Sequence, residues 1–223
     1  MKEVISSYDQ QERHFEDEET RAEYRRIVGG LSWPAVKPGF IVVVAEDLNK
    51  DPKLGVNHLR VLGEGEDSNL KELLRKCQDF GGRYRVQDFL GDAEDKGWME
   101  LLKQFNRNSK SGTIHLRNAP LVEDPKCFNY FVMSIKNRLF SDRAFHTLHF
   151  DETSTLPSYL KELRPEEVLT ATNSDHPAIS ALGFAVAYLN KFEYRPPIPP
   201  LSELKIHNLA ESYAVNVDFN RRR

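Results

Sequence analysis

Hydrophobic and polar positions along the chain follow two periods, one typical of strands and one typical of helices. Six consecutive apolar residues at 40–45 predict a strand that is buried on both faces of a sheet. Residues 56–63 predict a second strand, close enough in sequence to pair antiparallel with the first. A helix is then predicted from residues that repeat at i, i+3, i+4 and i+7 and end before Gly81-Gly82: Leu70, Leu73, Leu74 and Cys77.

The rest of the chain alternates between the same two kinds of pattern. Short strands are predicted at 84–89, 113–116 and 144–150, and helices at 96–106, 125–139, 157–163 and 178–189. Strands that alternate with helices favour parallel crossovers. The predicted fold class is therefore α/β, a mixed sheet that begins with an antiparallel pair, continues with parallel crossovers and is flanked by helices.

Both ends of the chain differ from its centre. Residues 10–28 lack Pro and Gly and are dense in charge, so we expect a helical arm that Gly29-Gly30 end. The proline-rich stretch 195–200 excludes helix and central strand and reads as a linker. We predict a helical arm over 1–30, a domain over 38–192, and a linker with a C-terminal tail over 193–223.

Composition excludes several classes of protein. The 223 residues are 39% hydrophobic and 29% charged, which is typical of a soluble globular protein. The longest apolar run has six residues, too short for a membrane span, and no secretory signal follows the N-terminus. The two cysteines, Cys77 and Cys127, lie in apolar helical patterns and are expected to be buried free thiols. We expect a cytoplasmic protein.

Charge is distributed unevenly along the chain. The net charge is -3, which excludes a strongly basic nucleic-acid coat. Residues 96–150, however, carry nine Lys or Arg and four Asp or Glu, a net +5. This excess fits a phosphate-binding face or a solvated helix surface equally well. The candidates for contact with a DNA backbone are Lys103, Arg107, Lys110 and Arg138.

Carboxylates stand where such a sheet could bring them together. Glu46 and Asp47 close the run at 40–45, Asp88 lies in the strand after the first helix, and Asp175 precedes the late helix. Three or four carboxylates at one sheet edge would hold Mg²⁺ or Mn²⁺, and two such ions can cleave a phosphodiester. Structural roles stay open: Asp175 as a helix N-cap, Glu46 and Asp47 as strand ends, and Asp88 paired with an arginine.

With these acids, the order of elements and the segment Ser174–Ala185 resemble the ribonuclease H-like nuclease domain of phage large terminases, over roughly residues 38–192. Asp175-His176 and Ser180-Ala181-Leu182 match the outline of that family's late motif. The resemblance implies DNA cleavage during genome packaging, with two Mg²⁺ or Mn²⁺ ions. Carried over by position, its catalytic acids would be Glu46, Asp88 and Asp175, and its metal ligands Glu46, Asp47, Asp88, Asp92 and Asp175.

Two departures from the family pattern define two hypotheses. No G-x-x-x-x-G-K-[ST] loop occurs, so a packaging ATPase would be a separately encoded partner. His176 and Ser180 also stand where the family often has acids. The first hypothesis is a two-metal endonuclease acting on double-stranded DNA. The second is a catalytically inactive packaging or assembly adaptor of the same fold, whose arm and tail bind a partner protein.

Overall fold

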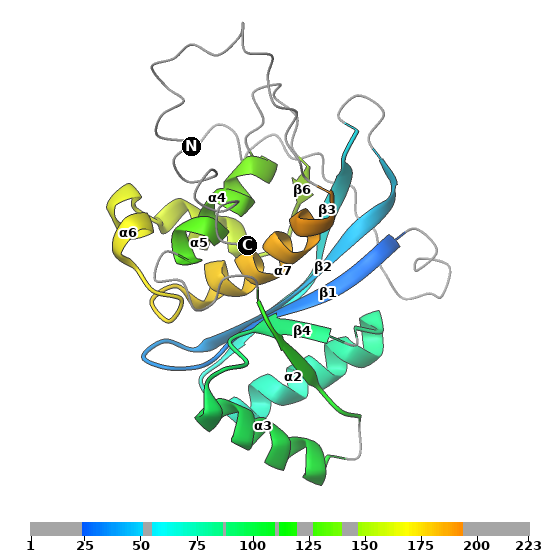
Figure 1. Cartoon of the computed structure of the whole chain (residues 1–223), viewed down its shortest axis with the longest axis vertical. Helices are drawn as coiled ribbons and strands as arrows, with labels where there is room; N and C mark the ends of the chain where they lie inside the picture. Colours follow the sequence, from blue (N-terminus) through cyan, green and yellow to red (C-terminus); the bar gives the residue numbers. More distant parts are fainter. Residues whose placement is uncertain are drawn as a thin grey trace, which may run out of the picture. The chain divides into compact units, whose positions relative to one another are not determined.

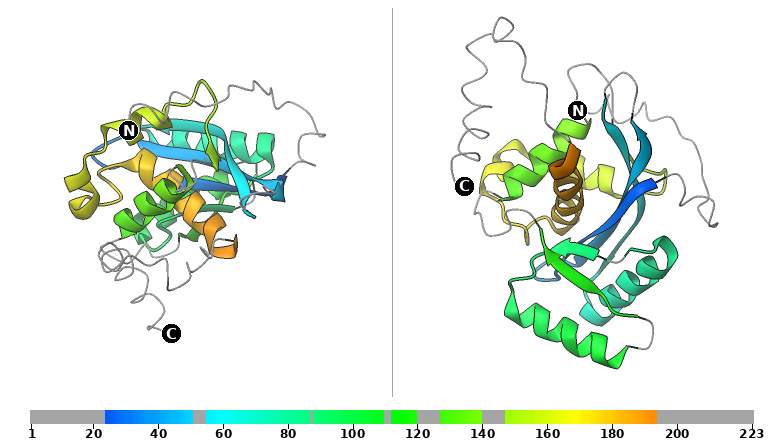
Figure 2. Two further views of the ribbon diagram at one scale, coloured as in Figure 1. Left: turned by 90° about the horizontal axis from the view of Figure 1, so that it is seen from above. Right: turned by 45° about the vertical axis from the view of Figure 1, so that its right-hand side comes forward.

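The computed structural model describes residues 24–50, 55–86, 88–109, 112–119, 127–139 and 147–193. Within these ranges one sheet of six strands lies between two layers of helices (Figures 1 and 2). The strands are β1 (Tyr24–Ser32), β2 (Gly39–Lys50), β3 (Asn57–Asp67), β4 (Asp88–Gly91), β5 (His115–Asn118) and β6 (Leu148–His149). The helices are α2 (Leu70–Tyr84), α3 (Lys96–Asn108), α4 (Cys127–Leu139), α5 (Leu156–Glu162), α6 (Pro165–Thr170) and α7 (Pro177–Glu193).

The sheet is mixed, in the order β5-β4-β1-β2-β3-β6. Strand β2 is antiparallel to both β1 and β3, whereas β4 is parallel to β1, β5 to β4 and β6 to β3. The parallel strands are reached through helices, as parallel pairing requires. Antiparallel leading strands followed by parallel crossovers, with helices on both faces, confirm the predicted fold class.

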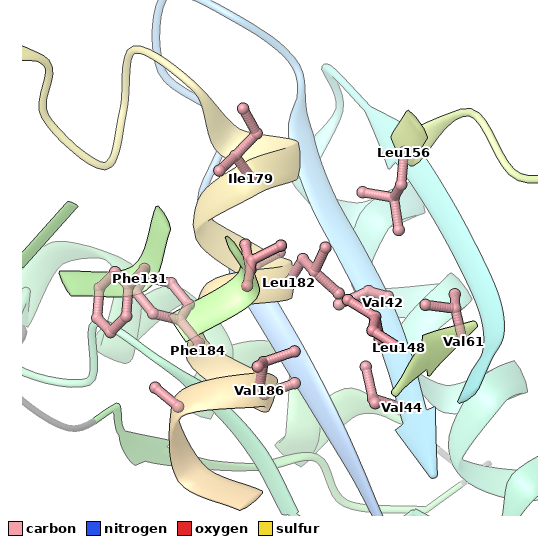
Figure 3. Packing of buried hydrophobic residues seen from close by; sticks show 14 of the residues in the cluster. Val42, Val44, Val61, Phe131, Leu148, Leu156, Ile179, Leu182, Phe184 and Val186 are labelled. Carbon is pink, nitrogen blue, oxygen red and sulfur yellow. The ribbon is translucent and has the colours of Figure 1, made fainter. Parts of the chain in front are cut away.

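The larger core lies between the sheet and the helices α4 and α7 (Figure 3). Val42 and Val44 of β2 face Leu182 and Val186 of α7, and all four are fully buried. Gly30 allows this close approach, because a Cβ atom there would overlap the carbonyl oxygen of Ala181. The small-residue helix predicted over 178–189 thus packs directly on the sheet.

A second core covers the opposite face of the sheet, under α2 and α3. Ile41 and Val43 contribute to it, so successive residues of β2 enter different cores. This confirms that the run at 40–45 is a strand buried on both faces. Trp33 stacks on Trp98 of α3, with ring centroids 5.6 Å apart, and holds the turn after β1 against this layer.

The prediction of a helical arm over 1–30 is wrong for residues 24–30. Tyr24–Ser32 form β1, the strand to which both β2 and β4 pair. Gly29 and Gly30 do not end a helix; they make room for the Phe89 ring and the α7 backbone, on opposite sides of the strand. Residues 1–23, which hold the rest of the predicted arm, lie outside the described residues, as do 194–223.

Other boundaries also moved. Helix α2 continues through Gly81-Gly82 to Tyr84 and ends at Arg85, which has a left-handed backbone with φ of 52°. The strand predicted from residue 84 therefore begins at Asp88. Cys77 is a buried free thiol, as predicted, and burial raises its pKa. In the described part of the chain, no helix is long and apolar enough to cross a membrane.

Candidate functional site at the sheet edges

Strand directions decide where the candidate carboxylates lie. Because β2 runs opposite to β1, its end lies beside the start of β1, and Glu46 pairs with Arg26. Asp88 is the first residue of β4, which is parallel to β1. Glu46, Asp47 and Asp88 thus lie near the amino-terminal ends of β1 and β4, which we call the N-edge. These three acids therefore lie away from the carboxyl-terminal edge, where open α/β sheets commonly bind ligands.

Asp92 and Asp175 lie at that opposite edge, the C-edge. Asp92 directly follows β4. Helix α7 passes over Gly30 at Ala181, while its Tyr188 lies near Tyr24 at the start of β1. The start of α7, which Asp175 precedes, therefore points towards the end of β1. The predicted metal ligands are divided between two ends of the sheet.

At the N-edge, arginines neutralise the carboxylates. Glu46 is 1% exposed and lies 3.9 Å from Arg25 Nη1 and 3.8 Å from Arg26 Nε. Asp47, on the other side of the strand, accepts hydrogen bonds from Arg60 Nε at 3.1 and 3.3 Å. Glu46 is therefore the inward residue of the pair, and each carboxylate belongs to a different ion pair.

Asp88 also has a cationic partner. Arg117 Nε of β5 lies 2.8 Å from its Oδ1, and the Asp88 side chain is 34% exposed. The structure thus bears out the alternative that Asp88 is paired with an arginine. The cost of a charge in this partly buried position is offset by that pair.

At the C-edge, backbone groups hold the carboxylates. Asp92 Oδ1 accepts hydrogen bonds from the backbone N–H groups of Glu94 and Asp95, at 3.0 and 3.2 Å. Asp175 Oδ2 accepts from the backbone N–H and the hydroxyl of Thr172, at 2.7 and 2.8 Å. These bonds lower the pKa of Asp175. Asp175 therefore binds back to the preceding turn and does not cap α7.

Two serines lie at the C-edge in addition to the acids. Continuing the register in which Gly30 pairs with Leu90 puts Ser32, the last residue of β1, level with Asp92. Ser32 is buried, and β1 contains no carboxylate. Ser180 of α7 is fully buried and donates to the carbonyl oxygen of Asn173 at 3.0 Å. Sequence reasoning missed Ser32 because it lies between the predicted helical arm, which ends at residue 30, and the predicted domain, which begins at residue 38.

Among the described residues, no three His, Cys, Asp or Glu side chains form a group that could hold a metal ion. His176 stacks on Phe128 with ring centroids 5.3 Å apart, and its pKa is lowered, chiefly by burial and then by Lys37. His176 thus belongs to the packing around the start of α7. Asp92 and Asp175 are the two predicted metal ligands that lie at the C-edge, and Glu66, at the end of β3, is a further acid at that edge.

The candidate DNA-contacting residues have different surroundings. Arg138 is 2% exposed and donates to Asn190 Oδ1 at 2.7 Å and to the carbonyl oxygen of Asn57 at 2.8 Å. The prediction that it holds a DNA backbone is wrong, because its guanidinium joins α4 to α7 and β3 inside the protein. Lys103 and Arg107 lie exposed on α3, and Lys110 is outside the described residues.

One cavity at the N-edge combines several of these groups. It has a volume of about 210 Å³ and is lined by the start of β1, by β4, by the residue that follows α2 and by one residue of α7. We call it the arginine cavity. Its polar lining comprises Tyr24, Arg25, Arg26, Arg85, Asp88 and Tyr188. Sequence reasoning missed it, since its arginines come from segments read as a helical arm and a strand.

Comparisons with known proteins give structural likeness alone. No protein-family model and no curated protein matches the chain by sequence. The manganese-bound large terminase nuclease domain of bacteriophage SPP1 is similar in structure, with 15% identity and a TM-score of 0.49 over 78% of this chain and 92% of that one. The large terminase of a thermophilic bacteriophage matches at 9% identity and a TM-score of 0.47, over 75% of this chain and 40% of that one.

A viral resolvase is a more distant neighbour. The fowlpox virus resolvase, in complex with Holliday junction DNA, matches at 11% identity and a TM-score of 0.37, over 75% of this chain and 99% of that one. At such identities a likeness does not transfer an activity.

Proposed function

We propose that the chain is a non-hydrolytic ribonuclease H-like module that serves as a cytoplasmic adaptor in a DNA-packaging assembly and binds a separately encoded packaging ATPase. One observation carries the proposal: the five candidate metal ligands are divided between two edges of the sheet, and each is held by an arginine or by a turn. A two-metal site needs carboxylates that converge with uncompensated charge. These carboxylates lie in ion pairs or in turns instead.

The C-edge supports the proposal at two further positions. A carboxylate at Ser32 would stand beside Asp92, and one at Ser180 would stand where the terminase family often has an acid. Both positions hold buried hydroxyls, and Ser180 is fixed to Asn173. A hydroxyl in place of a carboxylate removes a negative charge from the surroundings of a metal ion.

The second candidate is a metal-dependent DNA endonuclease. It is favoured by the position of Asp92 and Asp175 at the C-edge, where open α/β sheets commonly bind ligands. Bound Mg²⁺ or Mn²⁺ would activate a water and stabilise the leaving oxygen of a phosphodiester. The hydrogen bonds from Glu94, Asp95 and Thr172 end on one oxygen of each aspartate, Asp92 Oδ1 and Asp175 Oδ2, so the second oxygen of each would be the one to hold the metal.

Plasmid cleavage separates the two candidates. Supercoiled plasmid is incubated with the purified chain in Mn²⁺, in Mg²⁺ or in EDTA, together with Asp92→Asn, and with Asp88→Asn as a control at the other edge. We expect no metal-dependent cutting by the wild type. Cutting that requires metal and is lost in Asp92→Asn but kept in Asp88→Asn would replace the adaptor with the endonuclease.

A gain-of-function variant makes a negative result informative. Restoring carboxylates with the double variant Ser32→Asp, Ser180→Asp should raise the affinity of the folded protein for Mn²⁺, measured by calorimetry, because two further acids would then join Asp92 and Asp175. The adaptor role is tested by mixing the wild type with the packaging ATPase of the same genome. We expect a complex by light scattering that persists in EDTA; two separate species would contradict it.

A further inference from the structure

We infer that His58 and His149 form a site for a divalent transition-metal ion, such as Zn²⁺ or Ni²⁺. The two histidines lie on neighbouring strands, β3 and β6, near the end of the sheet that holds Asp47. This place lies away from Asp92 and Asp175 and is not the site that the terminase resemblance assigns. The inference does not rest on the proposed function, because it requires neither nuclease activity nor a partner protein.

The backbone places both imidazoles on the same face of the sheet. Leu59 and Leu148 pair with each other across β3 and β6, and both are fully buried in the larger core. Successive side chains of a strand point to opposite faces, so His58, which precedes one leucine, and His149, which follows the other, point away from that core. The Leu59 N–H donates to the carbonyl oxygen of Thr147 at 2.7 Å and fixes this register. Both histidines remain partly exposed, so an ion reaches them from solvent.

The two rings meet edge to edge, nitrogen to nitrogen. His58 Nδ1 lies 2.5 Å from His149 Nε2, with the ring centroids 4.8 Å apart and the ring planes 19° apart. Given the size of an imidazole ring, these distances agree only if both nitrogens lie on the line between the ring centres, so each points at the other. Ordinary hydrogen bonds of an N–H group begin at about 2.7 Å. Two neutral imidazoles share one proton here, whereas a metal ion accepts a lone pair from each.

Two imidazole nitrogens select the class of ion. Imidazole is a ligand for Zn²⁺, Ni²⁺ and Cu²⁺, whereas Mg²⁺ and Ca²⁺ prefer oxygen. With metal–nitrogen distances of about 2.0–2.1 Å, neighbouring nitrogens are about 2.9 Å apart around a square-planar ion and about 3.3 Å apart around a tetrahedral one. The separation of 2.5 Å must therefore grow by about 0.4–0.8 Å, which small rotations of both side chains supply. No third His, Cys, Asp or Glu joins the pair within the described part of the chain, so water fills the other positions.

The positive charge next to the pair is compensated. Arg60 pairs with His149 across the two strands, and its Nε donates to both oxygens of Asp47, at 3.1 and 3.3 Å. His58 and His149 also interact with other groups of the protein. A metal ion takes one nitrogen of each ring, and the other nitrogen of a metal-binding histidine commonly keeps a protein partner. A bound ion therefore does not require those interactions to be absent.

The test is isothermal titration calorimetry of Ni²⁺ and Zn²⁺ into the full chain, free of any histidine tag, at neutral pH. The variants are His58→Gln, His149→Gln and the double variant, which remove imidazoles and keep polar side chains. His115→Gln is the matched control, because His115 is exposed on β5, the strand at the opposite edge of the sheet. Urea unfolding in EDTA checks the fold of each variant. Long-range proton–nitrogen NMR spectra of the histidine rings follow the wild type itself.

We expect the wild type and His115→Gln to bind Ni²⁺ alike. Each single variant should bind at least about tenfold more weakly, since even the loss of a partner of a metal ligand costs that much. The double variant should lose no more affinity than either single variant, because both imidazoles hold the same ion. Mn²⁺ should bind more weakly than Ni²⁺ or Zn²⁺. In the spectra, the ring nitrogens of His58 and His149 should shift together as Zn²⁺ is added.

Three results would overturn the inference. The control could lose as much affinity as the single variants, the losses of the two single variants could add in the double variant, or the ring nitrogens of His58 and His149 could stay unchanged in excess Zn²⁺. The first two would assign the ion to separate surface histidines. The third needs no variant, so it decides even where a variant does not fold. None of these results bears on plasmid cleavage, so the two proposals fail independently.

Discussion

At the scale of single residues, the fate of a carboxylate depends on which neighbour compensates its charge. Glu46 is buried between two arginines, and Asp88 is paired with a third across the β4–β5 ladder. Removing one member of such a pair leaves the other charge uncompensated, whereas removing both can be nearly neutral. The acids at the C-edge differ, because hydrogen-bond donors of nearby turns hold them.

Asp175 offers a test of that difference. Asp175→Ala removes the acceptor for Thr172 and should destabilise the protein by about 1 kcal/mol, as when a side-chain cap is lost. Asp175→Asn keeps an oxygen acceptor and should cost less. Urea unfolding at neutral pH measures both. A structural role predicts that Mn²⁺ shifts the unfolding midpoints of wild type and Asp175→Asn equally; a shift confined to the wild type would indicate a metal ligand.

The pH dependence of stability at this residue has a definite sign. The lowered pKa of Asp175 means that the folded protein binds its proton more weakly than the unfolded chain. Its contribution is therefore complete above the ordinary pKa of 3.8 and is lost as the pH falls through the lower value of the folded state. The stability gap between wild type and Asp175→Asn should close from about pH 5 towards about pH 2. A gap that widens would contradict this role.

At the scale of elements, the sequence predicts best where one physical signal dominates. The run at 40–45 is long, apolar and β-branched, so burial on both faces leaves no alternative to a central strand. The apolar spacing from Leu70 to Cys77 similarly leaves only an amphipathic helix, and Leu73, Leu74 and Cys77 are its buried side. Both predictions depend on local pattern alone.

The sequence predicts poorly where a residue is chosen for a distant neighbour. Gly29 and Gly30 look like a helix end, yet they serve contacts with Phe89 and Ala181, far along the chain. Because these two glycines favour a helix end, the pattern does not predict β1. Without β1, the sequence gives no reason to place Ser32 beside the end of β4 at the C-edge. Likewise, nothing in the composition distinguishes buried Arg138 from a surface arginine.

Two glycines, one at the contact of β1 with α7 and one in α2, should respond in opposite ways to substitution by alanine. Gly30→Ala should destabilise the protein by about 3 kcal/mol or more, because its Cβ would overlap a carbonyl of α7 and force the helix from the sheet. Gly82→Ala meets nothing within 4 Å in helix α2 and should stabilise by up to about 1 kcal/mol. The denaturant midpoint should be lower for Gly30→Ala than for Gly82→Ala. Equal midpoints would show that the contact of Gly30 with Ala181 does not govern the packing of α7 on the sheet.

At the scale of the whole molecule, the position of β1 decides where the chain can be shortened. It is a central strand of the sheet, hydrogen-bonded to β2 on one side and β4 on the other, and it contributes to both cores. Partner contacts assigned to an arm over residues 1–30 therefore cannot be tested by removing all thirty residues. That deletion takes away seven of the nine residues of β1.

Two deletions separate folding from partner binding. Removing residues 1–23 leaves every described strand in place, so we expect a cooperative urea transition. Removing residues 1–30 should abolish the cooperative transition, because β2 and β4 lose the strand between them. If the shorter deletion keeps its fold but no longer joins the packaging ATPase, the arm carries the contact. If the shorter deletion keeps both its fold and its binding to the ATPase, the first 23 residues are not needed for the contact. The contact then belongs to the folded domain or to the tail.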